Sequence, residues 1–167
     1  MTPASVQIRA AGARDWPRME ALARAWPAHF VSAGIEAMHE DLRHWPALAA
    51  VAEGEILGFV IWSNTPPDAE MLWLVVDPAH VRQGVGSALI QAVADRVGHA
   101  RRLTLKTATT DSAIAGTAFR GSAYKDTHRF FQHLGFRDVR VLRGVWGPAN
   151  HALEMAREPG GAIPAPE

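Results

Sequence analysis

A stretch in the middle of the chain has the residue types of an anion-binding turn. It begins with the apolar run 71–76, passes Asp77-Pro78, and reaches Gly84 and Gly86 where a helical pattern starts. Glycine lets the backbone approach a ligand closely, and the free N–H groups at a helix start attract negative charge. The stretch therefore favours a phosphate-bearing ligand, with a simple tight turn as the alternative.

Two common phosphate-binding designs do not fit this stretch. A dinucleotide fingerprint needs a third small residue three positions after Gly86, where Leu89 stands. A P-loop needs a Gly-Lys-Ser/Thr tripeptide, which the sequence lacks. A phosphate-binding role for the glycine pair therefore requires a third design.

Histidine pairs in the chain do not predict a metal site. His39 and His44 lie five residues apart, and so do His128 and His133. Five residues correspond to about 140° around a helix, so neither pair shares a face. The chain also has no cysteine, which excludes cysteine-ligated metals, disulfides and a thiol nucleophile. We therefore expect no metal.

The hydrophobic periodicity predicts the elements that position the glycine pair. Helical spacing follows Asp15, spans 35–45, covers 85–97 and returns at 124–134, where Gly135 ends the pattern. A loop rich in Thr, Ser, Ala and Gly occupies 108–123. Alternating or continuous apolar runs predict strands at about 6–9, 48–52, 56–62, 71–76, 103–107, 139–142 and 152–155.

Length and composition indicate one globular domain. The chain has 167 residues, 48% of them hydrophobic, and a formal net charge of zero. This composition excludes global disorder and makes a nucleic acid an unfavourable partner. The N-terminus lacks a leader pattern, and no stretch approaches the roughly 18 apolar residues of a membrane span. We expect a cytoplasmic domain over 1–157, no membrane partner, and a disordered Pro/Gly-rich tail over 158–167.

Two motifs in register resemble the GNAT (GCN5-related N-acetyltransferase) superfamily. Residues 81–86, Val-Arg-Gln-Gly-Val-Gly, are similar to its Arg/Gln-x-x-Gly-x-Gly/Ala pyrophosphate loop. Residues 127–136 are similar to its Ala-x-x-Phe-Tyr-x-x-x-Gly-Phe helix. The resemblance covers about 5–157 and implies an α/β fold, with a mixed, mainly antiparallel twisted sheet of about seven strands flanked by helices. The implied order is β-α-α-β-β-β-α-β-α-β-β.

The resemblance implies that acetyl-CoA enters where the two central strands splay apart. The implied cofactor-binding residues come from the central strand, the pyrophosphate loop and the later helix. They are Val75, Val76, Val81, Arg82, Gln83, Gly84, Val85, Gly86, Ser87, Tyr124 and Phe131. Val81 departs from the motif's Arg/Gln, so side-chain help must come from Arg82 or Gln83, while the backbone cradle is unaffected.

The implied reaction is transfer of an acetyl group to an amine by direct attack. Glu70 matches the position of a catalytic glutamate in many members, and it is the expected proton acceptor. A solvated glutamate is the alternative. Phe131 stands where many members carry a proton-donating tyrosine, and phenylalanine has no proton to donate. Tyr124, on the same helical face, or solvent is then expected to protonate the thiolate.

The expected acceptor is a primary amine of a small molecule or peptide. Acidic residues outnumber basic ones in 1–70, which favours a cationic acceptor, whereas basic residues dominate 95–143. A homodimer is compatible with the sequence. Because Val81 and Phe131 depart from the motifs, a non-catalytic acyl-CoA-binding sensor or regulatory module is the alternative to an enzyme.

Overall fold

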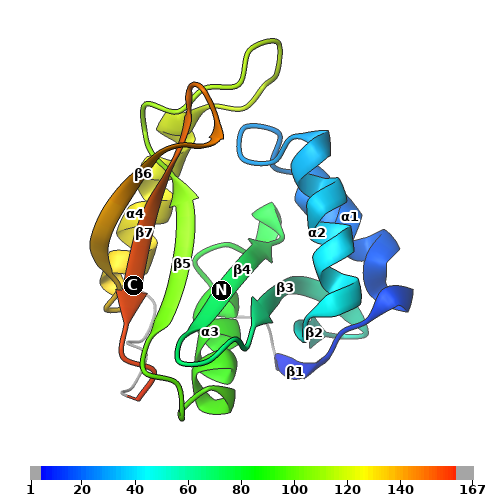
Figure 1. Cartoon of the computed structure of the whole chain (residues 1–167). Helices are drawn as coiled ribbons and strands as arrows, with labels where there is room; N and C mark the ends of the chain where they lie inside the picture. The colour runs from blue at the N-terminus through cyan, green and yellow to red at the C-terminus, as the bar shows by residue number, and fades with distance from the viewer. Residues whose placement is uncertain (1–4, 161–167) are drawn as a thin grey trace.

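One seven-stranded sheet runs through the described part of the chain, in the order β1-β2-β3-β4-β5-β7-β6 (Figure 1). The computed structural model describes residues 5–160. The strands are β1 Gln7–Ala10, β2 Ala47–Ala52, β3 Glu55–Ser63, β4 Ala69–Val76, β5 Leu103–Ala108, β6 Arg137–Gly147 and β7 Asn150–Arg157. The α-helices are α1 Trp16–Arg24, α2 Ser32–His44, α3 Val85–Arg96 and α4 Tyr124–His133. The expected fold class and element order are confirmed.

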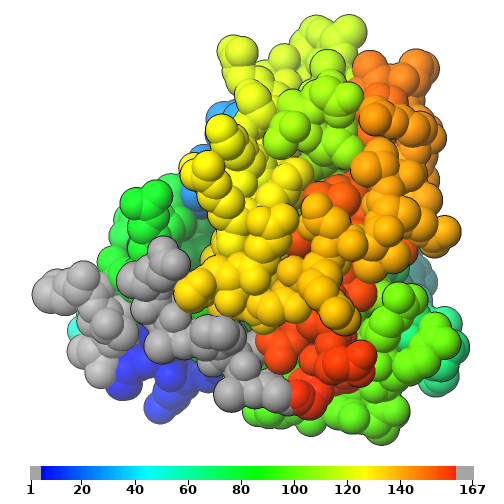
Figure 2. All heavy atoms as spheres, turned by 90° about the vertical axis from the view of Figure 1, so that its left-hand side faces the viewer, coloured from blue at the N-terminus to red at the C-terminus, as the bar shows by residue number. Residues whose placement is uncertain are grey.

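The helices cover the two faces of the sheet in pairs. Apolar residues of α1 and α2 pack on β2 and β3 in one cluster of buried side chains. Residues of α3 and the end of α4 pack on the opposite face in a second cluster, which reaches β5 and β7. Figure 2 shows α4 (yellow) at the surface beside β6 (orange). Strand β3 is buried from Ile56 to Ser63 because helices cover it on both sides.

Strands β4 and β5 are parallel, unlike the other neighbouring pairs of the sheet. Their ladder joins Ala69, Glu70 and Met71 to Leu103, Thr104 and Leu105, and it stops there. The later residues of β4 keep β3 as their partner, while those of β5 keep β7. The expected splay therefore opens immediately after Met71 and Leu105, in the middle of the sheet.

An irregularity in β4 lies beside this opening. Ile61 of β3 pairs with Trp73, while the next residue, Trp62, pairs with Met71, so Leu72 is an extra residue. A bulge of this kind changes which face the following side chains occupy. Met71 packs in the cluster beneath α3, whereas Leu72 and Trp73 both pack against the cluster beneath α1 and α2.

The structure corrects several details of the predicted elements. Strands β6 and β7 extend beyond 139–142 and 152–155 because they form one long hairpin. The helix that follows Asp15 begins at Trp16, and the Asp15 carboxylate accepts the N–H of Gly12 at 3.1 Å and pairs with Arg9. Most of the predicted tail, 158–167, lies outside the described residues.

Gly58 of β3 allows α3 to begin close to the sheet. A Cβ atom at this position would lie 2.9 Å from the carbonyl oxygen of Val75 and 3.1 Å from Cγ1 of Val85. Val85 is the first residue of α3 and is 1% exposed. The absence of a side chain at Gly58 therefore fixes the distance between the start of α3 and the end of β4.

We expect Gly58→Ala to lower the free energy of unfolding by about 1–3 kcal/mol, because the added methyl group must displace backbone as well as a side chain. Urea unfolding measures the effect. Gly34→Ala is the matched control, since nothing lies within 4 Å of that position in α2 and alanine favours helix. Equal stability of the two variants would contradict this account of Gly58.

Candidate active site

The glycine pair forms a turn that leads directly into α3. Gly84 precedes the helix with φ of 84°, and Arg82 also has a positive φ, of 61°. The first intrahelical bond of α3 joins the Ala88 N–H to the Gly84 carbonyl at 2.9 Å. The N–H groups of the preceding positions belong to the first turn, which has no partner further back in its own helix. This end of α3 has the geometry of an anion cradle.

Gly86 brings β4, α3 and α4 together. A Cβ atom at this position would lie 3.0 Å from Cζ of Phe130 and 3.6 Å from Cγ2 of Val76. Phe130 belongs to α4 and Val76 ends β4. The two segments that carry the sequence motifs therefore meet at the end of the central strand, beside the splay.

The backbone of β4 presents alternate residues to the splay. The Asp77 N–H donates to the Leu57 carbonyl at 2.8 Å, so the hydrogen bonds of this pair point toward β3. Because bonded pairs alternate along an antiparallel ladder, Val76 and Leu74 direct their N–H and C=O groups toward the opening. The same alternation directs the groups of Val75 toward β3. Of the two valines that were expected to offer backbone groups, geometry favours Val76.

The carbonyl of Val76 already has a partner from the other side of the site. It accepts a hydrogen bond from Nε1 of Trp26 at 2.8 Å. Trp26 lies in the segment between α1 and α2, which covers the wide end of the splay. A ligand that bonds to this carbonyl must therefore share it with the indole or displace the indole.

Glu70 lies at the narrow end of the splay, on the face opposite α3. Its neighbours Ala69 and Met71 pack in the cluster beneath α3, so the Glu70 side chain points to the other face. There its Oε2 atom lies 2.6 Å from Nζ of Lys106 on β5. Both side chains are partly exposed, 28% for Glu70 and 31% for Lys106. The carboxylate is therefore accessible from the face that α1 and α2 flank.

Tyr124 connects the start of α4 to the segment between α1 and α2. Its hydroxyl donates to the His29 carbonyl at 2.8 Å, and the Arg120 N–H donates to the Ala28 carbonyl at 2.9 Å. Burial raises the pKa of the Tyr124 phenol. Burial also lowers the pKa of the His29 imidazole, which favours its neutral form. These contacts hold the two halves of the splayed sheet together at its wide end.

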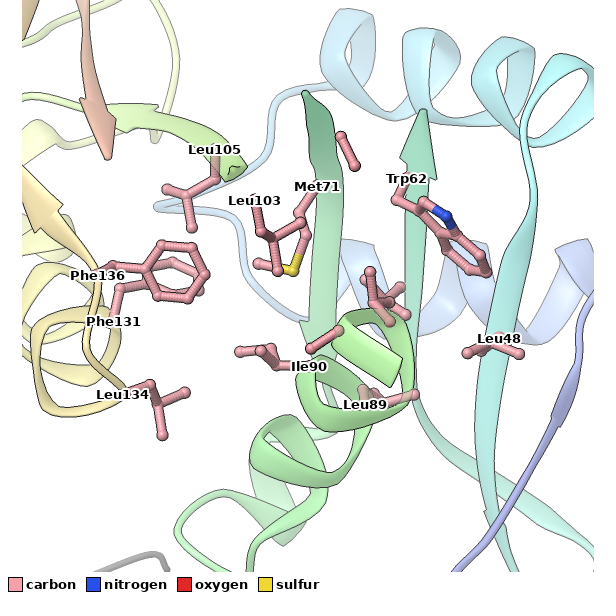
Figure 3. Packing of buried hydrophobic residues seen from close by; sticks show 14 of the residues in the cluster. Leu48, Trp62, Met71, Leu89, Ile90, Leu103, Leu105, Phe131, Leu134 and Phe136 are labelled. Atoms are coloured by element: carbon pink, nitrogen blue, oxygen red, sulfur yellow. The ribbon is translucent and has the colours of Figure 1, made fainter. Parts of the chain in front are cut away.

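Three of the expected cofactor residues have side chains that are either buried or exposed to solvent. Phe131 is 7% exposed and packs with Phe136 toward Leu105 in the core (Figure 3). Its neighbour Phe130 is the ring that touches the cradle. Val81 is 40% exposed on the turn before α3. The side chain of Val85 is buried, so only its backbone is available to a ligand.

Within residues 5–160, no cluster of three or more histidine, aspartate or glutamate side chains is arranged to hold a metal ion. His128 instead bonds to the Ala108 carbonyl at 2.8 Å, and His44 bonds to Glu40 at 2.9 Å. None of the helices described here is long and apolar enough to cross a bilayer.

Sequence reasoning did not single out Lys106 as part of the site. The alternation of Leu103, Thr104, Leu105 and Lys106 does place Lys106 on the polar face of its strand. What was missing is the parallel register that sets β5 beside β4, because register depends on pairing between segments over 30 residues apart. The bond from Trp26 to Val76 was unpredictable for the same reason.

The sequence matches a family model described as an acetyltransferase (GNAT) domain over residues 42–138. This range contains β4, the cradle, α3, β5 and α4. No curated protein matches the sequence significantly.

Solved structures of acetyltransferases share the fold over nearly the whole chain. A GNAT-family protein from Desulfovibrio desulfuricans has 19% identity and a TM-score of 0.75, covering 93% of this chain and 100% of its own. The ribosomal-protein-S18-alanine N-acetyltransferase from Escherichia coli has 18% identity and a TM-score of 0.70, covering 98% and 96%. An aminoglycoside 6'-N-acetyltransferase complexed with coenzyme A has 20% identity and a TM-score of 0.71, covering 96% and 99%.

The family model spans more than half of the chain, and the splayed sheet, the cradle before α3 and the α4 motif agree with it. This protein is therefore a member of the GNAT acetyltransferase family, an acyltransferase fold built around a break between two central strands.

Proposed function

We propose that this protein transfers the acetyl group of acetyl-CoA to a primary amine of a small molecule or peptide. The observation that carries the proposal is the position of two features on opposite faces of one opening. The cradle lies at the start of α3 on one face, and Glu70 lies on the other, at the narrow end of the splay. Acetyl-CoA and the amine acceptor would approach from opposite faces of the sheet and meet between β4 and β5.

The residues present fit coenzyme A. The backbone N–H groups from Gln83 to Ser87 would hold its pyrophosphate, and the exposed Arg82 beside them would add charge. The backbone groups of Val76 would form hydrogen bonds with the pantetheine arm. The Trp26 indole would then release the Val76 carbonyl. When bound, the acetyl thioester supplies the electrophilic carbonyl carbon for the transfer.

Glu70 would accept the proton that the acceptor ammonium must lose before it attacks. An alkylammonium has an ordinary pKa of about 10.4, so a neutral amine is scarce at pH 7 unless a base assists. The Glu70 carboxylate is held at a fixed position by Lys106 and is accessible from the acceptor face. It accounts for deprotonation without a metal ion or a second carboxylate.

The departing thiolate would take its proton from solvent rather than from Tyr124. The Tyr124 hydroxyl donates its proton to the His29 carbonyl, and burial raises the pKa of the phenol. Both effects disfavour loss of that proton. The geometry therefore favours Tyr124 as a positioning residue, which would hold the segment between α1 and α2 over the cofactor.

The acceptor side combines acidic groups with aromatic rings. Trp73 donates to the Asp41 carboxylate at 2.7 Å, and Phe30 lies edge-on to Trp73 with ring centroids 6.2 Å apart. Negative charge and π faces both attract cations. A cationic amine fits this face, and amines of both a protein and an aminoglycoside are substrates of fold relatives by their names.

A non-catalytic acyl-CoA sensor is the alternative, because Val81 and Phe131 depart from the family motifs. Steady release of coenzyme A in a panel of amines distinguishes the two. A thiol-reactive dye reports this release without background, since the chain has no cysteine. Acetyl-CoA binding with no release for any amine would favour the sensor.

We expect Ser87→Glu to weaken acetyl-CoA binding by at least about tenfold, because it adds negative charge at the N-terminal turn of α3. Calorimetric titration with acetyl-CoA measures the change. Ser32→Glu is the matched control, since Ser32 begins α2 away from the cradle and is exposed. Equal affinities of the two variants for acetyl-CoA would contradict the assignment of this turn as its binding site.

We expect Glu70→Gln to lower kcat/KM for the amine acceptor by about 10²-fold or more at pH 7, with acetyl-CoA affinity unchanged. The deficit should shrink as the pH approaches the acceptor's own pKa, where the amine no longer needs a base. Initial rates of thiol release across pH test both points. Glu55→Gln, at an exposed position on β3, is the control. A deficit that is constant with pH would argue against a base.

We expect Tyr124→Phe to lower stability by about 1 kcal/mol through the lost bond to His29, and to lower kcat by less than about threefold. Denaturant unfolding and thiol release are measured on the same preparation. A general acid typically contributes 10²-fold or more, so a loss of that size at unchanged affinity would reinstate Tyr124 as the proton donor.

A further inference from the structure

Lys106 stands in the position of an acceptor amine. Its Nζ atom lies 2.6 Å from the carboxylate of Glu70, which is the distance at which a general base must hold the amine that it deprotonates. We propose that Lys106 is a self-acetylation site: in the absence of an external acceptor, its amine takes the acetyl group from bound acetyl-CoA. This proposal rests on the proposed function.

The strand geometry places Lys106 at the opening itself. The β4–β5 ladder ends at the pair Met71 and Leu105, and Lys106 is the next residue of β5. It therefore lies across the narrow end of the splay from Leu72, the extra residue of β4. Leu105 is buried beneath α4, so Lys106 points to the acceptor face, with its side chain 31% exposed.

A second carboxylate lies next to Lys106 on the neighbouring strand. Lys106 is in register with Glu154 of β7, whose side chain is 13% exposed and pairs with Arg140 at 3.1 Å. Neighbouring strands thus present Glu70, Lys106, Glu154 and Arg140 in a row of alternating charge.

The reaction is balanced without a further reactant. The Lys106 ammonium gives one proton to Glu70, and the neutral nitrogen attacks the thioester carbon. The C–S bond breaks as the nitrogen loses its second proton, and the thiolate takes a proton from solvent. The products are acetyl-Lys106, coenzyme A and one proton released to solvent. Acetylation removes the lysine's charge and leaves Glu70 without this ion pair.

The chain allows a clean test because Lys106 and Lys125 are its two lysines. The full-length protein is incubated with acetyl-CoA and no amine, digested with trypsin, and analysed by mass spectrometry. Trypsin does not cleave after acetyl-lysine, so modification at Lys106 yields the peptide 103–120 carrying one acetyl group. Lys125, exposed on α4 away from Glu70, reports non-specific acetylation.

Two variants isolate the step. Glu70→Gln keeps the lysine but removes the base, and we expect it to slow acetylation of Lys106 by about 10²-fold or more. Lys106→Arg keeps the positive charge beside Glu70 and has no amine to modify, so the 103–120 modification is lost while the fold is kept. In the protein without substitutions, a saturating concentration of an amine that supports release of coenzyme A should also slow acetylation of Lys106.

The outcomes separate this proposal from the proposed function. Acetyl-CoA binding and turnover of an external amine without acetylation of Lys106 would overturn self-acetylation alone. Equal labelling of Lys106 and Lys125, or labelling unaffected by Glu70→Gln, would overturn it as well by showing uncatalysed chemistry. Failure to bind acetyl-CoA in a titration would overturn both proposals.

Discussion

The architecture of the site follows from the break in the sheet between β4 and β5. A parallel ladder that continued past Met71 and Leu105 would bond every backbone group of β4 to a neighbouring strand. Because the ladder stops, the backbone N–H and C=O groups of Val76 point away from β3 and have no strand partner on that side. The Val76 carbonyl is bonded to the Trp26 indole instead, and we propose that the amide groups of the pantetheine arm bond to this edge of β4.

The other features of the site lie around this break. Gly58 brings the start of α3 close to β4, and the cradle then lies at the wide end of the splay. The bulge at Leu72 lies beside the narrow end, next to Glu70. The contact between Tyr124 and His29 joins the separated halves where no strand pairing does so. These contacts hold the segment between α1 and α2 beside the start of α4.

Much of this arrangement could be predicted from local sequence patterns. Apolar periodicity located the helices and strands, and the positive φ at Gly84 agrees with a glycine-dependent turn. The limits appear wherever segments far apart in the chain meet. The sequence named Phe131, Val75 and Val76 for the cofactor, whereas in the structure Phe130 and Val76 lie beside Gly86, because a shift of one residue decides which group faces the turn. Pairing of Lys106 with Glu70 required a strand register that no local pattern encodes.

Hydrogen exchange at single amides of β4 measures whether acetyl-CoA binds at the splay. We predict that acetyl-CoA slows exchange of the Leu74 and Val76 N–H groups, which face away from β3 toward the splay, together with those of Gly84 to Ser87. The Val75 N–H, which faces β3, should change little. Protection of Val75 alone, or protection confined to residues away from the splay, would contradict the assignment of this opening as the acetyl-CoA site.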